Sequence, residues 1–202
     1  MTFRYTDEAI ACLDRRLIER FSRLKSLLSV DEINPMGEIN DLYTYIRKLT
    51  RQIYGALADR VYRDSREQDL TGLRSLDEEW VDALLSGYDP VSKYVFDHEL
   101  DRKCARLIEA VLSSDTPGSE VDRALRAVSY QCRIYADRVT DEAVMQAYND
   151  EGESYVRWVA ELDEKTCRVC RQRNGHIYEI DAVPPDPHPN CRCRRERVIP
   201  HD

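Results

Sequence analysis

The sequence predicts an α+β protein, in which a mainly α-helical body is followed by a small β-containing module. Apolar residues recur every three or four positions through most of residues 1–150, which is the period of an amphipathic helix. After Gly152 this period gives way to short β-prone runs, and the C-terminal stretch holds four of the seven cysteines. We therefore divide the chain into a helical body, residues 1–150, and a β module, residues 153–202.

The body is expected to begin with two long helices, at about 6–30 and 41–64. Thr6 is placed as the N-cap of the first helix, because a hydroxyl there can accept a backbone N–H bond. The intervening residues 31–40 contain asparagine, proline and glycine and are expected to form a loop.

Three further helices are expected before the module. A Ser-x-x-Glu capping box predicts a short helix over 75–85. Asp89 followed by Pro90 has the pattern of an N-cap and a first helical residue, and so predicts the start of the next helix. A long helix is expected over 119–149, either unbroken or restarting at Thr140.

The module contains three strand candidates, at 155–161, 176–180 and 194–200, with a proline-rich extended loop over 183–189. A piece of this size cannot bury enough apolar surface to be stable by itself. It must dock on the helices, be held together by a cross-link that we call the staple, or both.

A cysteine and histidine cluster is the candidate staple. Cys167 and Cys170 have the Cys-x-x-Cys spacing of a zinc knuckle, and His188 and Cys191 repeat the same gap. Cys191 and Cys193 would face the same side of a strand, so Cys193 can replace His188 as a ligand. The sequence predicts a structural zinc ion held by four of these five residues.

The alternative to zinc is a disulfide or a set of free thiols. The N-terminal residues hold early acids and no apolar core of a signal peptide, so we expect a reducing compartment, in which clustered cysteines favour metal. Five soft donors exceed the four that tetrahedral zinc needs, which favours a closed structural site over a catalytic one.

Charged residues near the cluster have two interpretations each. Asp163 and Glu164 form an acid pair that an enzyme can use, although we favour Asp163 as an acceptor of backbone N–H bonds that supports the metal turn. A basic run follows the cluster, and it predicts either contacts with phosphate or an acidic partner, or a solvated strand face: Arg192, Arg194, Arg195 and Arg197.

Composition excludes several classes of function. The net charge of −8 and a pI near 5.2 disfavour a non-specific nucleic-acid binder. No run approaches the eighteen or so apolar residues of a membrane span, so no membrane partner is expected. The chain has no Gly-rich phosphate loop, Gly-x-Ser-x-Gly elbow or HExxH motif, and we expect no enzymatic activity.

One ordered set of residues resembles the C-terminal signature of phage head-morphogenesis proteins, the minor capsid proteins similar to phage Mu protein F. The resemblance covers about residues 140–195 and is most specific in its His-Pro-Asn-Cys-Arg-Cys ending. The set comprises Tyr148, Gly152, Trp158, Asp163, Thr166, Cys167, Cys170, Gly175, Pro184, Pro185 and the run from His188 to Cys193.

The resemblance implies a structural virion component of the head interior, present in the host cytoplasm during assembly. It implies association with the portal protein, and contact with scaffold, major capsid protein or packaged DNA. Positions shared by most family versions fall on Asp163, Gly175, Cys191 and Cys193. The cysteine-rich versions also match Cys167, Cys170 and His188, whereas Mu-like members lack the first Cys-x-x-Cys.

Two alternatives remain from the residues themselves. A zinc module that binds nucleic acid would use the arginines at 192–197. A small metal-dependent hydrolase or nuclease would need an open metal position and a positioned acid such as Asp163 or Glu164.

Overall fold

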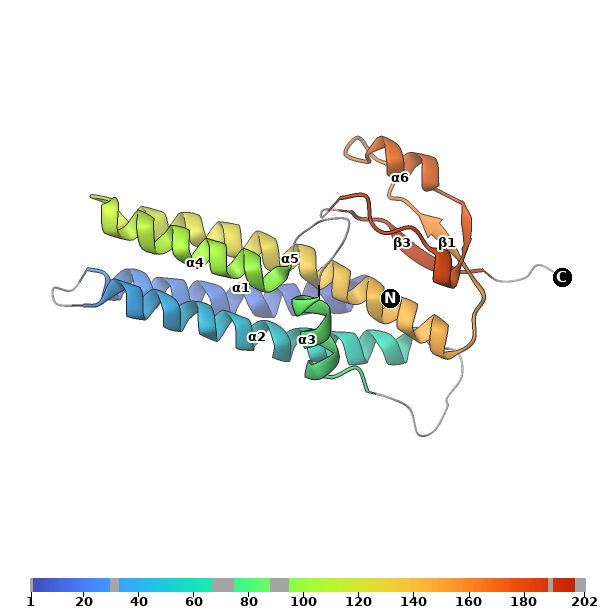
Figure 1. The fold of residues 1–202 in the computed structure, drawn as a ribbon, viewed down its shortest axis with the longest axis horizontal. Coiled ribbons are helices and arrows are strands. Elements are labelled where there is room, and N and C mark those ends of the chain that lie inside the picture. The colour runs from blue at the N-terminus through green and yellow to red at the C-terminus, as the bar shows by residue number, and fades with distance from the viewer. Residues whose placement is uncertain (1, 30–32, 67–74, 88–94, 189–190, 199–202) are drawn as a thin grey trace.

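The computed structural model describes residues 2–29, 33–66, 75–87, 95–188 and 191–198 (Figure 1). The body consists of α1 (Thr2–Leu27), α2 (Pro35–Asp64), α3 (Glu78–Ser86), α4 (Phe96–Ser113) and α5 (Pro117–Asp150). The module consists of β1 (Tyr155–Val159), α6 (Arg168–Arg173), β2 (Ile177–Glu179), the 3₁₀ helix η1 (Ile180–Ala182) and β3 (Arg194–Arg197). The predicted α+β fold class is confirmed.

The four long helices of the body lie side by side, and the short α3 lies across α2 (Figure 1). α2 and α5 each pack against all three of the other long helices, so these two helices form the centre of the bundle. The apolar stripe of α1 is buried as its period predicts, with Leu13, Leu17 and Phe21 at most 1% exposed. Each such side chain contributes about 2 kcal/mol through burial.

Both long N-terminal helices begin earlier than the sequence predicts. Thr6 is therefore not an N-cap; it lies inside α1, and its hydroxyl is 2.8 Å from that of Thr140 on α5. The predicted loop over 31–40 is wrong from Pro35 onward. Asn34 caps α2 by accepting the N–H of Gly37 at 3.3 Å, and Pro35 takes the first helical position, where its missing N–H costs nothing.

The later helices show one further correction. Asp77, rather than Ser75, caps α3, and its carboxylate accepts two backbone N–H bonds at 3.1 and 3.2 Å. The Ser75 hydroxyl instead donates to Asp59. The predicted cap at Asp89 and Pro90 lies outside the described residues, and α4 is described from Phe96. α5 runs unbroken through Thr140, the first of the two alternatives.

The module holds an antiparallel three-stranded sheet in the order β2-β1-β3. The three predicted strands are confirmed, each shorter than expected. On β1, Val156 and Trp158 are fully buried, while Tyr155 is exposed, so one face of the sheet is covered. The register places Trp158 opposite Arg195 on β3.

The module lies beside the C-terminal half of α5, with β3 in contact with that helix (Figure 1). None of the described helices combines the length and the apolar character that crossing a bilayer takes.

Candidate metal centre

The first half of the cluster is a knuckle built around α6. Cys167 is the N-cap of this helix, and its sulfur accepts the N–H of Cys170 at 3.3 Å. Gly175 follows the helix with a φ of +81°, a left-handed conformation that glycine adopts without strain, and its N–H bonds to Trp158 O at 2.7 Å. The turn therefore returns the chain to β1 and fixes the knuckle on the sheet.

Asp163 joins this knuckle to the second half of the cluster. Its carboxylate accepts the N–H of Lys165 at 2.9 Å and the hydroxyl of Thr166 at 3.0 Å. Arg192 donates to both of its oxygens, at 2.7 and 2.8 Å. The Arg192 hydrogen bonds, followed by that from Thr166, hold the pKa of Asp163 well below its usual range. This carboxylate is charged and bridged by Arg192.

The five candidate ligands lie together in two overlapping groups. One group is Cys167, Cys170 and His188, and the other is Cys170, Cys191 and Cys193; within each, all ligand atoms lie within 4.8 Å of one another. The four cysteines of the cluster are free thiols, and none of them forms a disulfide. The buried Cys170 is common to both groups and is the centre of the cluster.

Two of the separations around Cys170 match those of a tetrahedral metal site. Two sulfurs bound to one zinc ion at about 2.3 Å are separated by about 3.8 Å in a regular tetrahedron. Cys170 Sγ lies 3.7 Å from Cys191 Sγ and 3.8 Å from His188 Nε2. Residues from two remote stretches of the chain therefore already stand at the separations that one ion would impose.

The pKa values of the cluster thiols are shifted in opposite directions. Hydrogen bonding from Cys191 lowers the pKa of Cys193 to about 6, with further help from Cys170 and Trp158. The same bond to Cys193, with burial, raises the pKa of Cys191, and burial raises the pKa of Cys170 to about 12. Thiolate ligands bind metal in place of protons. A bound cation would therefore stabilise the thiolate forms of these neighbouring cysteines.

The structure is compatible with either predicted fourth ligand, His188 or Cys193. His188 belongs to the group that contains Cys167, and Cys193 belongs to the group that contains Cys191. The second half of the cluster is also joined by a backbone hydrogen bond, in which the N–H of Cys191 donates to His188 O at 3.2 Å.

The arginines that follow the cluster make contacts inside the molecule. Arg195 is 7% exposed, lies in ion pairs with Asp141 on α5 and with Asp186, and stacks 4.2 Å over the Trp158 ring. Arg192 holds Asp163, as described above. Arg194 is exposed and lies 2.8 Å from Glu196.

Arg197 makes a second link to the body. It forms ion pairs with Glu151 and with Glu153, the latter at 2.5 Å, and stacks 4.9 Å over the ring of Tyr148. The buried Arg195 and the half-buried Arg197 of β3 therefore hold the module against the C-terminal part of α5.

Three features of this region have no counterpart in the sequence predictions. α6 was expected only as a turn, because six residues show no helical period. The contacts of Trp158 were not predicted, and the guanidinium groups of Arg195 and Arg173 lie 4.2 and 4.8 Å from the centre of its ring. The partner carboxylate Asp141 was not singled out; an acid in the last third of an amphipathic helix gives no signal of burial.

The fold and the cluster can now be compared with known proteins. Residues 101–196 match the family model described as Phage Mu protein F like protein. This match covers slightly less than half of the chain, namely most of α4, all of α5 and nearly the whole module, and it confirms the resemblance seen in the sequence. It begins further upstream than the expected residue 140, so the matched region includes helices of the body's second half as well as the cluster.

At the family level the Mu F-like match supports a phage head protein. No curated protein and no solved structure matches the chain.

Proposed function

We propose that this Mu F-like protein is a minor head protein of a phage or prophage, which acts in capsid assembly by associating with the portal protein. The family match over residues 101–196 is the observation that carries this proposal. The role is structural rather than catalytic. Scaffold, major capsid protein and packaged DNA are the other head components that it can contact, in the head interior and, during assembly, in the host cytoplasm.

The cluster is proposed to hold one structural zinc ion. Cys167, Cys170 and Cys191 supply three ligands, and His188 or Cys193 supplies the fourth. Thiolate-rich tetrahedral donor sets select zinc among the common divalent ions. When bound, the ion supplies about 10 kcal/mol toward folding of the module.

Two observations support a structural role over catalysis. The donors outnumber the four tetrahedral positions, so no position is reserved for a water or a substrate. Asp163, the carboxylate beside the knuckle, is bridged by Arg192, and the contacts of Arg195 and Arg197 with acids of this chain compete with phosphate. These contacts favour a head protein over a nucleic-acid-binding module.

Portal association is tested by co-expression with a phage portal protein, which is first sought in the reading frames next to this gene. The expected result is a complex that survives gel filtration, and detection of this chain at low copy in purified heads by mass spectrometry. Cys167→Ser with Cys191→Ser should weaken the complex, while Cys12→Ser, on α1, should not. A chain that never co-purifies with portal and is absent from heads contradicts the proposal.

Metal content is tested on the purified full chain by elemental mass spectrometry. One zinc ion per chain is expected. His188→Ala and Cys193→Ser are then compared, and the variant that loses zinc identifies the fourth ligand. A folded parent protein without zinc would overturn the metal proposal and leave the family match standing.

A further inference from the structure

The surface of the bundle is hollowed between α1 and α5. A hollow of about 370 Å³ there is lined by side chains of these two helices alone. The helices run antiparallel, since Thr6 meets Thr140 near the start of α1 and Lys25 meets Asp122 near its end. The hollow lies between these two contacts, and none of its lining residues belongs to the module or to the metal cluster.

Exposed apolar side chains form much of this hollow. Ile18 of α1 and Tyr130 of α5 are 53% and 55% exposed, and Leu125 is half-buried in the same lining. Among the described residues of the two helices, Ile18 and Tyr130 are the large apolar side chains that remain exposed, and both lie in this one hollow. Covering such surface with an aliphatic group is favourable by about 25 cal/mol per Å².

The acid in the lining is already neutralised within the chain. Asp14 accepts a hydrogen bond from the hydroxyl of Ser129, and its carboxylate lies 3.2 Å from the guanidinium group of Arg133. Glu19 and Asp122, which lie near the hollow in sequence, each pair with a cation of α1, at 3.8 and 2.6 Å. These acids therefore contribute little negative field to the hollow.

Two cations at the hollow have no ion pair within the described part of the chain. Arg126 is exposed in the lining and lies one turn before Tyr130 on α5. Arg15 is exposed on α1 and lies one turn before Ile18. The chain as a whole carries a net charge of −8, yet the charges that are available here are positive, which favours an anionic group beside the apolar surface.

The charge changes sign further along the groove between the two helices. Asp137 lies on α5 one turn beyond Arg133, and Asp7 of α1 is within electrostatic reach of it. Neither of these acids lines the hollow. An anionic ligand is therefore directed toward Arg126 and away from Asp137, which gives the groove a preferred orientation for what it binds.

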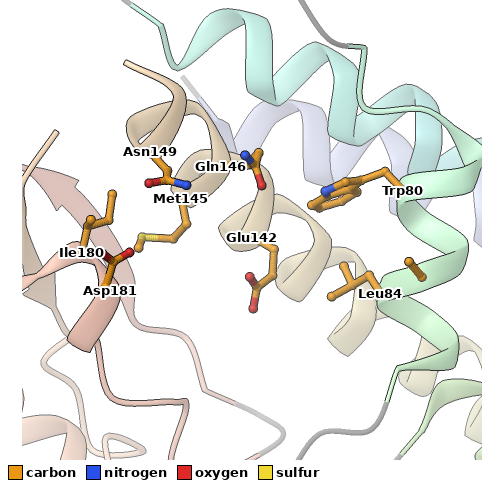
Figure 2. Close-up of a pocket in the computed structure, with 9 residues that line it drawn as sticks. Trp80, Leu84, Glu142, Met145, Gln146, Asn149, Ile180 and Asp181 are labelled. Atoms are coloured by element: carbon orange, nitrogen blue, oxygen red, sulfur yellow. The ribbon is translucent and has the colours of Figure 1, made fainter. Parts of the chain in front are cut away.

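The hollow between α3, α5 and η1, of about 340 Å³, lacks this character (Figure 2). Figure 2 shows polar side chains, Gln146 and Asn149 among them, next to the apolar Trp80 and Leu84. Glu142 in its wall already interacts within the chain. That hollow therefore favours neither an apolar nor a charged ligand.

We propose that the hollow between α1 and α5 is the docking site for an amphipathic helix of a partner protein, in which Asp or Glu residues flank large aliphatic side chains. An aliphatic side chain packs against Ile18 and Tyr130, and a carboxylate of the same helix meets Arg126. The inference goes beyond the proposed function, because neither portal association nor zinc binding requires this surface.

A helix fits this surface better than an extended segment does. Two antiparallel helices present parallel ridges with a groove between them, and a third helix can lay one row of side chains into such a groove. Its anchors would recur every three or four residues along the groove. The apolar anchors supply most of the affinity, and the arginines supply selectivity and a salt dependence.

The probe is a synthetic helix that has this chemistry. Its sequence is Glu-Glu-Leu-Ala-Ala-Leu-Glu-Ala-Ala-Leu-Ala-Ala-Leu-Lys, with fluorescein at the N-terminus and an amide at the C-terminus. The acids are confined to one half, so they can meet Arg126 without approaching Asp137. We expect a saturable rise in fluorescence anisotropy with the full chain, which weakens as salt is added. A probe with its leucines replaced by serine should not bind.

Charge reversal at Arg126 tests the electrostatic part. Arg126→Glu should weaken binding of the probe at least about tenfold. Arg106→Glu makes the same change at an exposed position of α4 and should leave the affinity within about twofold, as is usual for a remote surface charge.

Removal of the exposed apolar groups tests the anchor. Ile18→Ser with Tyr130→Ser should abolish binding of the probe, while the helical circular dichroism stays at the parent value because both side chains are more than half exposed. Met36→Ser with Leu112→Ser removes exposed apolar groups from α2 and α4, and this variant should bind like the parent.

The other outcomes overturn the inference. Absence of probe binding, or equal weakening by each variant and its control, shows that the hollow is not a docking site. Undiminished binding of the serine probe shows that charge alone attracts the peptide. A concentration-dependent dimer that is lost in Ile18→Ser with Tyr130→Ser shows that a second copy of this chain covers the hollow instead.

Discussion

The helical body and the C-terminal module are stabilised in different ways. In the body, more than one side chain from every helix is buried in a single apolar cluster. In the described part of the module, the buried apolar residues are few: Val156, Trp158, Ala160 and Cys170. The module therefore depends on a small number of strong local interactions, while the body spreads its stability over many weak ones.

This difference predicts how each region responds to damage. Loss of one contact in the body lowers the stability of a bundle that keeps its remaining contacts. Loss of one metal ligand or one buried charged group in the module removes a large share of the interactions that stabilise it.

Removal of the metal should unfold the module and spare the body. Cys170→Ser is the sharpest variant, because Cys170 belongs to both ligand groups. We expect loss of about 10 kcal/mol of metal-linked stability. Hydrogen exchange should become rapid over 155–197 while α1 and α2 stay protected, and Cys12→Ser should behave like the parent. Equal protection of the module in zinc-loaded and chelated protein would refute the contrast.

Arg195→Ala should weaken the contact between the helical body and the module. It leaves Asp141 without its cation and removes the group that stacks on Trp158. Breaking a buried ion pair in this way costs about 3–5 kcal/mol. Urea unfolding followed by tryptophan emission should show the loss. Arg195→Met with Asp141→Leu removes both charges and should recover much of it; failure of that recovery would show that packing on Trp158, not the ion pair, dominates.

Leu17→Ala should weaken the body alone. Leu17 is fully buried in the bundle, and truncation to alanine costs about 3 kcal/mol. The thermal midpoint of the helical signal should fall, while the zinc content stays at the parent value. A variant that loses zinc together with helix would show that the regions unfold as one unit.

Arg192→Ala should have the smallest effect. Its partner Asp163 is at the surface, where water screens the ion pair, and the backbone bonds of Asp163 remain. The module should stay folded and keep its zinc, with a modest loss of metal affinity measured by competition with a chelator. Complete loss of zinc would mean that this surface pair, rather than the thiolates, sets the cluster geometry.

The helices of the body were predictable because burial there is periodic. Leu13, Leu17 and Phe21 follow the helical spacing and all three are buried. The start of α2 was not predictable from composition alone, since Pro35 suits both a loop and a first helical turn, and only the Asn34 cap decides between them.

The cluster was recognisable because ligand spacing is a local property. Cys167 and Cys170 are close in sequence, and so are His188 and Cys191. The burial of Arg195 was not recognisable, because its partner Asp141 is 54 positions away and an arginine on a short strand usually faces solvent. Long-range pairing of charges leaves no pattern in either segment.

The unbroken course of α5 has a mechanical consequence. With 34 residues it is about 51 Å long, and it passes Thr140 without a hinge. Its N-terminal part packs in the bundle, and its C-terminal part is joined to β3 by the ion pairs of Arg195 and Arg197. A force applied to the module would be transmitted along a stiff rod to the opposite end of the bundle, with no hinge in α5 to absorb it.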